Sequence, residues 1–345
     1  MLLIAAPRRL NITRCLRLLL VLSLALFGLL VVLSAPPRPP TPSTTRPPQA
    51  SPPLNASKLA LLIEDRPQPV LAPILLHFIA VLPPSWPFLF LGSPASLSAL
   101  NASAPARAHV RTGKLSLRPI PANMSTAGQE MISRFLTSRW LYEVAVGTPP
   151  AEWLLVFQTD ATLCANSRLD VDAFLGLDWV GAPWTPDAQW GGNGGLSLRR
   201  VSRIVEVLRH QQRREDSEPE DVWLSERLAH FPGANVANGS VSLTFSGEMH
   251  SGVGEGAPAE PRFCNNGTML LCNEGGEHVR GIDDWRTGFY EPMGYHTGGS
   301  GKYLHSSIWG APELRSHIYG YCPEVKMAVA MDVARYVPGE CAGHW

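Results

Sequence analysis

The stretch Leu154-Leu-Val-Phe-Gln-Thr-Asp160 gives the clearest indication of the fold of this 345-residue chain. Its continuous apolar run, with Trp153 in front, predicts a strand over Trp153–Phe157 that is buried on both faces. Asp160 follows directly at the end of that strand. A carboxylate in such a place is costly to bury unless it meets a cation or hydrogen-bond donors. We therefore expect Asp160, with Gln158 beside it, to belong to a binding site.

Two further blocks follow at suggestive spacing. About thirty residues later, the cluster Gly191-Gly-Asn-Gly-Gly195 predicts a turn whose backbone approaches a sugar or phosphate without Cβ clashes. The apolar residues of Val201–Leu208 recur at helical spacing behind it. Glu220-Asp221 then opens a second helix. This order of a strand-end carboxylate, a glycine-rich turn and an acidic helix start indicates a sugar-nucleotide site. The turn's candidate binding residues are Gly192, Asn193, Gly194 and Gly195.

The rest of the chain from Lys58 alternates short apolar runs with helical patterns, which predicts an α/β domain. The expected strands are 59–63, 86–91, 113–117 and 153–157, and the expected helices include 73–82 and one that begins at Ser125. Such alternation favours a mainly parallel sheet flanked by helices. Ligands bind at the carboxyl ends of strands in these sheets, where Glu64, Asp65 and Asp160 fall. Beyond His230 the chain is glycine-rich, and we expect loops.

The N-terminal part predicts a membrane anchor. Residues 18–35 are uncharged and long enough to span a bilayer. Four arginines precede this segment, which favours a cytosolic tail over residues 1–17 and a lumenal remainder. Residues 36–57 form a Pro/Ser/Thr-rich stem, and residues 58–345 form one lumenal domain. A cleaved signal peptide is the alternative.

Composition and cysteine usage agree with a lumenal chain. The 29 basic and 29 acidic residues balance, which gives no basic footprint for nucleic acid. Glycosylation sequons follow the anchor at Asn55, Asn101, Asn123, Asn238 and Asn266. Spacing alone favours local disulfides Cys264–Cys272 and Cys322–Cys341, which would leave Cys164 unpaired, although sequence does not fix connectivity.

Each candidate residue has a chemical role and a structural alternative. Asp160 and His296 would hold a divalent cation, Mn²⁺ or Mg²⁺, on a diphosphate, although Gln158 stands where Asp-x-Asp motifs have their first acid. Asp221, or else Glu220, would be the base that accepts the acceptor hydroxyl's proton. Helix capping alone also explains that pair. Trp184 would stack on a sugar face, or simply belong to the core.

Several of these blocks together resemble a known family. The blocks are 157–166, 178–184, 191–199, 220–223 and 294–296. They resemble the mostly fungal, glycosyltransferase-like domain of unknown function 5672 family, over roughly Lys58 to Lys326. The resemblance implies a GT-A-like, Rossmann-related fold with Asp160 in the metal or nucleotide region. Glu220-Asp-Val also resembles a block of lumenal β-1,3-glycosyltransferases, which implies that Asp221 lies near the acceptor.

The expectation is a type II membrane glycosyltransferase of the Golgi or ER lumen. It would move a sugar from a nucleotide-diphosphate donor to a glycan or glycoprotein hydroxyl, with metal assistance and inversion. One alternative is a catalytically silent glycan-binding or chaperone-like protein on the same fold. Another is a hydrolase that uses paired carboxylates.

Overall fold

The computed structural model describes residues 53–147, 150–251, 280–282, 284–286 and 288–330. The predicted tail, anchor and nearly all of the stem lie outside these ranges. No helix within the ranges is long and apolar enough to cross a membrane.

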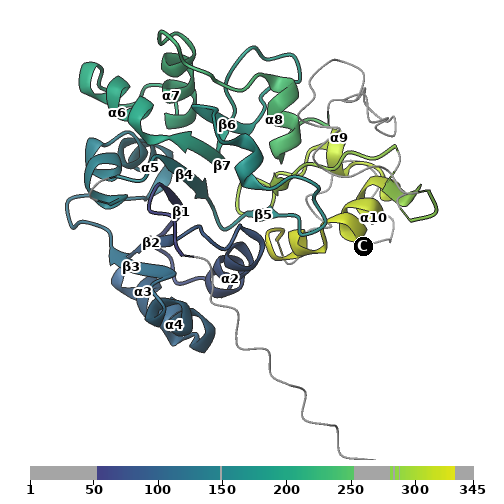
Figure 1. Ribbon diagram of the computed structural model, residues 1–345, viewed down its shortest axis with the longest axis horizontal. Helices are drawn as coiled ribbons and strands as arrows, with labels where there is room; N and C mark the ends of the chain where they lie inside the picture. Colours follow the sequence, from purple (N-terminus) through teal and green to yellow (C-terminus); the bar gives the residue numbers. More distant parts are fainter. Residues whose placement is uncertain (1–52, 148–149, 252–279, 283, 287, 331–345) are drawn as a thin grey trace, which may run out of the picture. The chain divides into compact units, whose positions relative to one another are not determined.

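A six-stranded sheet with the order β3-β2-β1-β4-β7-β6 forms the centre of the domain (Figure 1). Its strands are β1 (Lys58–Glu64), β2 (Phe88–Gly92), β3 (Leu115–Pro119), β4 (Trp153–Phe157), β6 (Trp179–Ala182) and β7 (Asn193–Arg200). The pairs β1–β2, β2–β3 and β1–β4 are parallel, whereas β7 is antiparallel to both β4 and β6. The sheet is therefore mainly parallel, with β7 as its single reversed strand.

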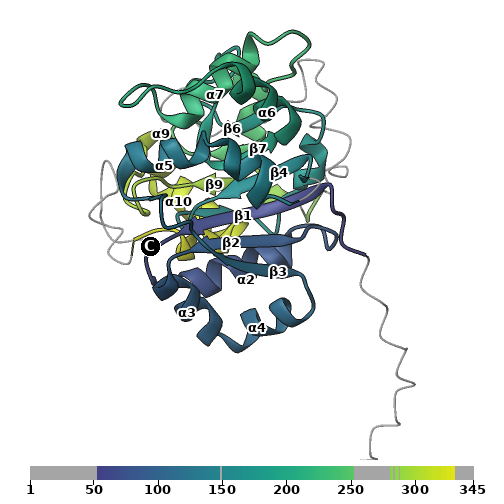
Figure 2. The ribbon, with the colours of Figure 1, turned by 90° about the vertical axis from the view of Figure 1, so that its left-hand side faces the viewer.

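Helices cover both faces of this sheet (Figure 2). One face carries α2 (Leu71–Val81), α3 (Pro94–Ala102) and α4 (Ala104–Arg111); the other carries α5 (Gly128–Leu136), η1 (Leu141–Ala145), α6 (Val201–His210) and α7 (Glu220–Ala229). Alternate residues of a strand enter opposite cores: in β4, Leu155 and Phe157 pack towards α2, whereas Leu154 and Val156 pack towards α6. Burial on both faces explains why β1, β2 and β4 are continuously apolar.

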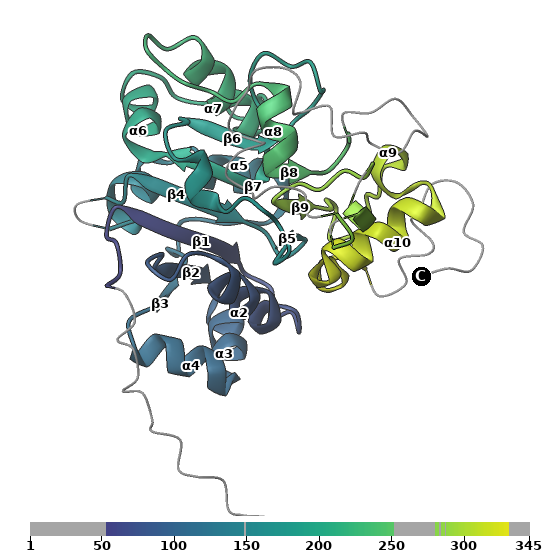
Figure 3. The same ribbon diagram turned by 45° about the vertical axis from the view of Figure 1, so that its right-hand side comes forward.

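A smaller sheet, β5-β9-β8, lies beside β4 and β7 together with the C-terminal helices (Figure 3). Its strands are β5 (Ala161–Leu163), β8 (Ser246–Gly247) and β9 (Gly294–His296). The surrounding helices are α8 (Gly239–Phe245), α9 (Ser306–Trp309) and α10 (Pro312–Tyr321), with the short 3₁₀ turns η2 (Val171–Phe174), η4 (Asp284–Arg286) and η5 (Pro323–Met327).

Two expectations about local structure were wrong. The chain beyond His230 is not only loop, because it contributes α8, α10 and two strands of the smaller sheet. The glycine cluster is a turn only at Gly191 and Gly192, whose φ angles are +100° and +147°. Asn193 already belongs to β7. Pairing with β4 and β6 satisfies the backbone hydrogen bonds of this glycine-rich strand.

The expected cysteine pairing was also wrong. Cys164 is bonded to Cys322, so Cys164 is not unpaired and Cys322 is not joined to Cys341. The partners are 158 residues apart in sequence, but the fold packs β5 against η5 and brings their Cα atoms within 4.7 Å. Cys264, Cys272 and Cys341 lie outside the described residues.

Candidate functional site

The order of the sheet strands defines where a ligand crevice would form. From β1 the chain proceeds outward through β2 to β3, and then returns to the other side of β1 as β4. Connections leave β1 and β4 in opposite directions, and ligands of open α/β sheets bind outside the carboxyl ends of strands at such a switch point. Glu64 ends β1 with Asp65 next to it, and Gln158 and Asp160 follow β4. The fold thus brings these four predicted residues to one edge of the sheet.

Asp160 is buried at this edge and its carboxylate is held on both sides. Oδ2 accepts a 2.8 Å hydrogen bond from the Ser300 backbone amide, and Oδ1 lies 3.5 Å from His296 Nε2. Burial works to raise the pKa of Asp160, but His296 and the Ser300 amide outweigh it and hold the pKa below its ordinary value. Asp160 therefore carries a negative charge at neutral pH.

His296, at the end of β9, joins Asp160 to a second carboxylate. Its Nδ1 lies 3.2 Å from Glu248 Oε1, an ion-pair distance without hydrogen-bond geometry, and its Nε2 lies 3.2 Å from Gln158 Oε1. Burial works to lower the pKa of His296, but Asp160 and Glu248 raise it to about 10. The imidazolium consequently lies between two carboxylates, 5% exposed.

Glycines let these groups approach β7 from opposite sides. A Cβ on Gly195 would lie 2.2 Å from His296 Nε2, whereas a Cβ on Gly194 would lie 2.4 Å from Glu220 Oε1 and 3.1 Å from the Asp221 Cβ. Any side chain at either position would push its neighbour away. The glycine pair therefore places the Asp160–His296 group on one side of β7 and the start of α7 on the other.

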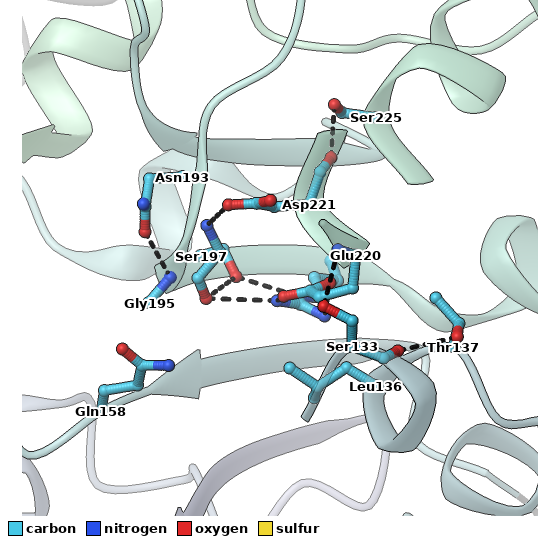
Figure 4. Close-up of polar contacts among 12 residues, drawn as sticks. Ser133, Leu136, Thr137, Gln158, Asn193, Gly195, Ser197, Glu220, Asp221 and Ser225 are labelled. Carbon is cyan, nitrogen blue, oxygen red and sulfur yellow. Dashed lines mark hydrogen bonds and ion pairs between the residues drawn. The ribbon is translucent and has the colours of Figure 1, made fainter. Parts of the chain in front are cut away.

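Asp221 lies at the start of α7 and faces the first residues of β7 (Figure 4). Its Oδ2 accepts a 3.0 Å hydrogen bond from the Gly194 amide, and its Oδ1 accepts one from Val222. The side chain is only partly buried. Because β7 is antiparallel to β4, Gly194 lies at the same sheet edge as Gln158.

Glu220 has a different environment from its neighbour. Its two oxygens accept hydrogen bonds from Arg199 Nη2 and Nη1 at 2.9 and 3.1 Å, and the Arg199 side chain is fully buried. Burial raises the pKa of Glu220 to about 7, with the charge of Asp221 adding to the effect against the pull of Arg199. Tyr142 completes the network by accepting from Arg199 Nη1 at 3.1 Å. These contacts fix the start of α7 on β7.

The other predicted residues occupy two places at the same edge. Glu64 accepts hydrogen bonds from Arg66 and from Gln68 Nε2, while the Asp65 carbonyl accepts one from Ser93.

The second place is the turn between β6 and β7. Partly buried Trp184 follows the end of β6, and a Cβ on Gly191 would lie 2.3 Å from the Trp184 ring. Asn193 Oδ1 accepts a 2.7 Å hydrogen bond from the Gly195 amide. Gly192 accepts one from the Trp179 indole.

Sequence reasoning missed three features of this edge. Glu248, which directly follows β8, lies against His296, a contact that no local sequence pattern indicates. Arg66 forms an ion pair with Glu64 at 2.7 Å; this contact first, and then the charges of Asp65 and Asp160, raise the pKa of Arg66. Its guanidinium therefore lies in the field of Asp160.

The third feature is the loop Gly298-Gly-Ser-Gly301, where four consecutive residues have φ between +51° and +79°. Ser300 is one of them, although a side chain disfavours this conformation. Successive backbone amides in such turns form concave sites for anions. The glycine spacing was visible in the sequence, but not its position over Asp160.

The donor atoms around His296 fit a divalent cation in part. Asp160 Oδ1 and Gln158 Oε1 lie 3.5 and 3.2 Å from His296 Nε2, so two oxygens, the ligands that hard cations prefer, lie close to one nitrogen. A cation there would compete with the proton on Nε2. Across the part of the chain that the structure describes, no group of three or more His, Cys, Asp or Glu side chains is arranged to hold a metal. Phosphate oxygens would have to complete the ligand set.

Comparison with known proteins agrees with part of the family resemblance. Residues 114–256 match the family described as Protein of unknown function (DUF5672), a shorter range than the sequence blocks indicate. No curated protein matches the chain.

Solved glycosyltransferases resemble the fold distantly. A mannosyltransferase, PcManGT from Pyrobaculum calidifontis in complex with GDP-Man and Mn²⁺, has 11% identity and a TM-score of 0.32, over 48% of this chain and 49% of its own. The galactosyltransferase LgtC, with donor and acceptor sugar analogues, has 16% identity and a TM-score of 0.35, over 76% and 96%. The bifunctional glycosyltransferase WbbM has 9% sequence identity and a TM-score of 0.37, and the match covers 81% of this chain and 52% of WbbM. Similarity this low says nothing about substrate or activity.

Proposed function

We propose that this protein transfers a sugar from a nucleotide-diphosphate sugar to a hydroxyl group of a glycan or glycoprotein. One observation carries the proposal. A buried acidic group, Asp160 with His296 and Glu248, lies at the switch point of an α/β sheet, under a left-handed glycine loop. A diphosphate fits such an edge, because its negative charge calls for a cation and its oxygens bind backbone amides that come close to it.

The donor would lie across the crevice between β1 and β4. Glu64 and Asp65 would hold the nucleoside, and the backbone of Gly298–Gly301 would approach the diphosphate. Arg66 would supply positive charge near the phosphates, since it already lies in the field of Asp160.

A divalent cation would be held by Asp160 and His296, with Gln158 alongside, and would neutralise the charge that develops on the leaving diphosphate. The Ser300 amide fixes the orientation of the Asp160 carboxylate. Gly195 leaves the room that the His296 ring needs.

The acceptor would approach from the α7 side. Asp221 is the better placed of the two acids, because Glu220 is committed to Arg199 while Asp221 is partly exposed. As the base, Asp221 would take the proton of the acceptor hydroxyl while that oxygen attacks the anomeric carbon and the diphosphate leaves from the opposite face. Direct displacement of this kind inverts the anomeric configuration. Trp184 and Asn193 would line the sugar's position.

We further propose a Golgi or ER lumenal location, with residues 18–35 as a type II anchor. The sequence pattern supports this location. The buried Cys164–Cys322 disulfide supports it as well, because such bonds are rare in the cytosol.

The test is a thermal-shift screen of the full-length protein against UDP-, GDP- and CMP-sugars with Mn²⁺, followed by product analysis. A ligand that binds only the folded state raises the melting temperature. We expect a shift with one nucleotide class that is lost in Asp160→Ala and kept in Asp187→Asn, an exposed matched control. Asp221→Asn should bind the donor and fail to transfer. Retention of configuration in the product would refute Asp221 as the base of a direct displacement.

One observation favours a second function, that of a silent glycan-binding protein on the same fold. Gln158 replaces the first acid of the usual Asp-x-Asp pair, and both nitrogens of His296 already face carboxylates or Gln158. Glycan binding without any donor-induced thermal shift, in a protein that unfolds cooperatively, would favour this function over transfer.

A further inference from the structure

The Cys164–Cys322 disulfide belongs to a closed ring of contacts around Asp160. On one arm, Asp160 is followed by β5 and then directly by Cys164. The Cys164 amide donates to the Met293 carbonyl at 2.9 Å, next to β9. Both cysteines are almost completely buried, so the bond lies inside the small core around β9 rather than on the surface.

The other arm leads from Cys322 to the glycine loop. Cys322 directly precedes η5, and the residues after η5 contact both ends of Gly298–Gly301. The Ala328 carbonyl accepts a 3.2 Å hydrogen bond from Thr297 Oγ1, and the Ala330 amide donates to the Gly301 carbonyl at 2.9 Å. The residues after η5 are therefore among the contacts that hold the loop in place.

The loop closes the ring by returning to Asp160. The Ser300 amide donates to Asp160 Oδ2, while the amide and hydroxyl of Thr297 donate to the Asp160 carbonyl at 2.9 and 3.0 Å. Glycine adopts the left-handed conformation of this loop readily, but Ser300, with φ of +59°, keeps it only where the surroundings impose it. The disulfide joins the chain after β5 to the start of η5, and the residues after η5 hold the loop through hydrogen bonds.

We infer that Cys164 and Cys322 are positioning residues: their disulfide holds the Gly298–Gly301 loop over Asp160 and so keeps the donor site assembled. Without the bond, η5 and the loop can move away from β5, and Asp160 loses the amide that orients it. The claim about the loop is independent of the ligand, whereas the claim about the donor rests on the proposed function. The site is accordingly complete only in the oxidised protein.

The test measures hydrogen exchange by mass spectrometry in the detergent-solubilised full-length chain. The wild type is compared with Cys164→Ser/Cys322→Ser and with reduced wild type. We expect peptides covering 297–302 to exchange at least tenfold faster without the disulfide, while β1 and β4 keep their protection. Asp160→Asn, which weakens the acceptor of the Ser300 amide but keeps the disulfide, should accelerate exchange in the same loop and so tests the contact between the loop and Asp160. If the double variant folds poorly, the reduced wild type keeps the test of the disulfide decisive.

Two results would overturn the inference. Unchanged exchange over 297–302 would show that the loop does not depend on the disulfide. Equal acceleration in β1 and β4 would show that the bond supports the whole domain rather than this loop.

Titration with UDP and GDP in the presence of Mn²⁺ separates the inference from the proposed function. Tighter binding to the oxidised protein supports both. Faster loop exchange in a protein that binds no nucleotide in either state supports the positioning role and contradicts the donor site.

Discussion

Gly195→Ala tests the packing on which the site depends. The new Cβ would lie 2.2 Å from His296 Nε2 and 2.5 Å from Cε1, whereas carbon contacts are favourable near ~3.5–4.0 Å. The ring must therefore move by about 1 Å or more. It has no room to do so freely, because it is buried between Asp160 and Glu248. Overpacking of this kind costs about 1–3 kcal/mol.

Urea denaturation measures the loss of stability, and nucleotide titration measures the loss of the site. We expect Gly195→Ala to lower the free energy of unfolding by about 1–3 kcal/mol, and to weaken donor binding about tenfold or more, which corresponds to about 1.4 kcal/mol. Gly320→Ala is the matched control. Its Cβ would meet nothing within 4 Å in helix α10, so it should stabilise by about 0.5–1 kcal/mol. If Gly195→Ala matches the wild type in both measurements, the packing of His296 on β7 is refuted.

Three further predictions concern the core and the charges. Arg199→Met leaves Glu220 buried without its partner and should cost about 3–5 kcal/mol in urea denaturation; adding Glu220→Leu should recover most of this loss. His296 has a pKa of about 10 in the folded protein against 6.5 unfolded, so its stabilisation is complete below pH 6.5 and lost as pH rises through about 10. The lowered pKa of Asp160 adds stability above its unfolded value of 3.8, and this stability is lost in acid. Melting temperatures in EDTA should therefore be highest between pH 3.8 and pH 6.5, and they should depend less on pH in His296→Gln. Phe78→Ala removes a ring stacked at 3.8 Å on β4 and should cost about 3–5 kcal/mol, measured in the same way.

The strands that are buried on both faces were predictable from the sequence, and so was the more exposed β3, two residues away from its expected range. The strands β6 and β7 and those of the smaller sheet were not. β1, β2 and β4 are continuously apolar because helices cover both their faces. β7 contains two glycines and two arginines, and Arg199 is buried only because Glu220 and Tyr142 meet it. The strands of the smaller sheet have two or three residues, too few for any periodic pattern.

The site could be predicted only as far as local sequence determines it. Asp160 was identifiable because a carboxylate at the end of a buried strand needs a partner. The partner contacts of His296 were not identifiable, since Glu248 is 48 positions and Gln158 138 positions away along the chain. The Cys164–Cys322 bond was missed for the same reason: spacing favours near neighbours, whereas packing of β5 on η5 selects distant ones.

The most direct test of the central claim is a crystal structure of the protein with a bound nucleotide diphosphate and Mn²⁺. The account predicts that the diphosphate lies within hydrogen-bonding distance of the Gly298–Gly301 backbone, beside Asp160, with the nucleoside towards Glu64 and Asp65. A nucleotide bound away from the carboxyl ends of β1 and β4, or an empty crevice at saturating nucleotide, would contradict it.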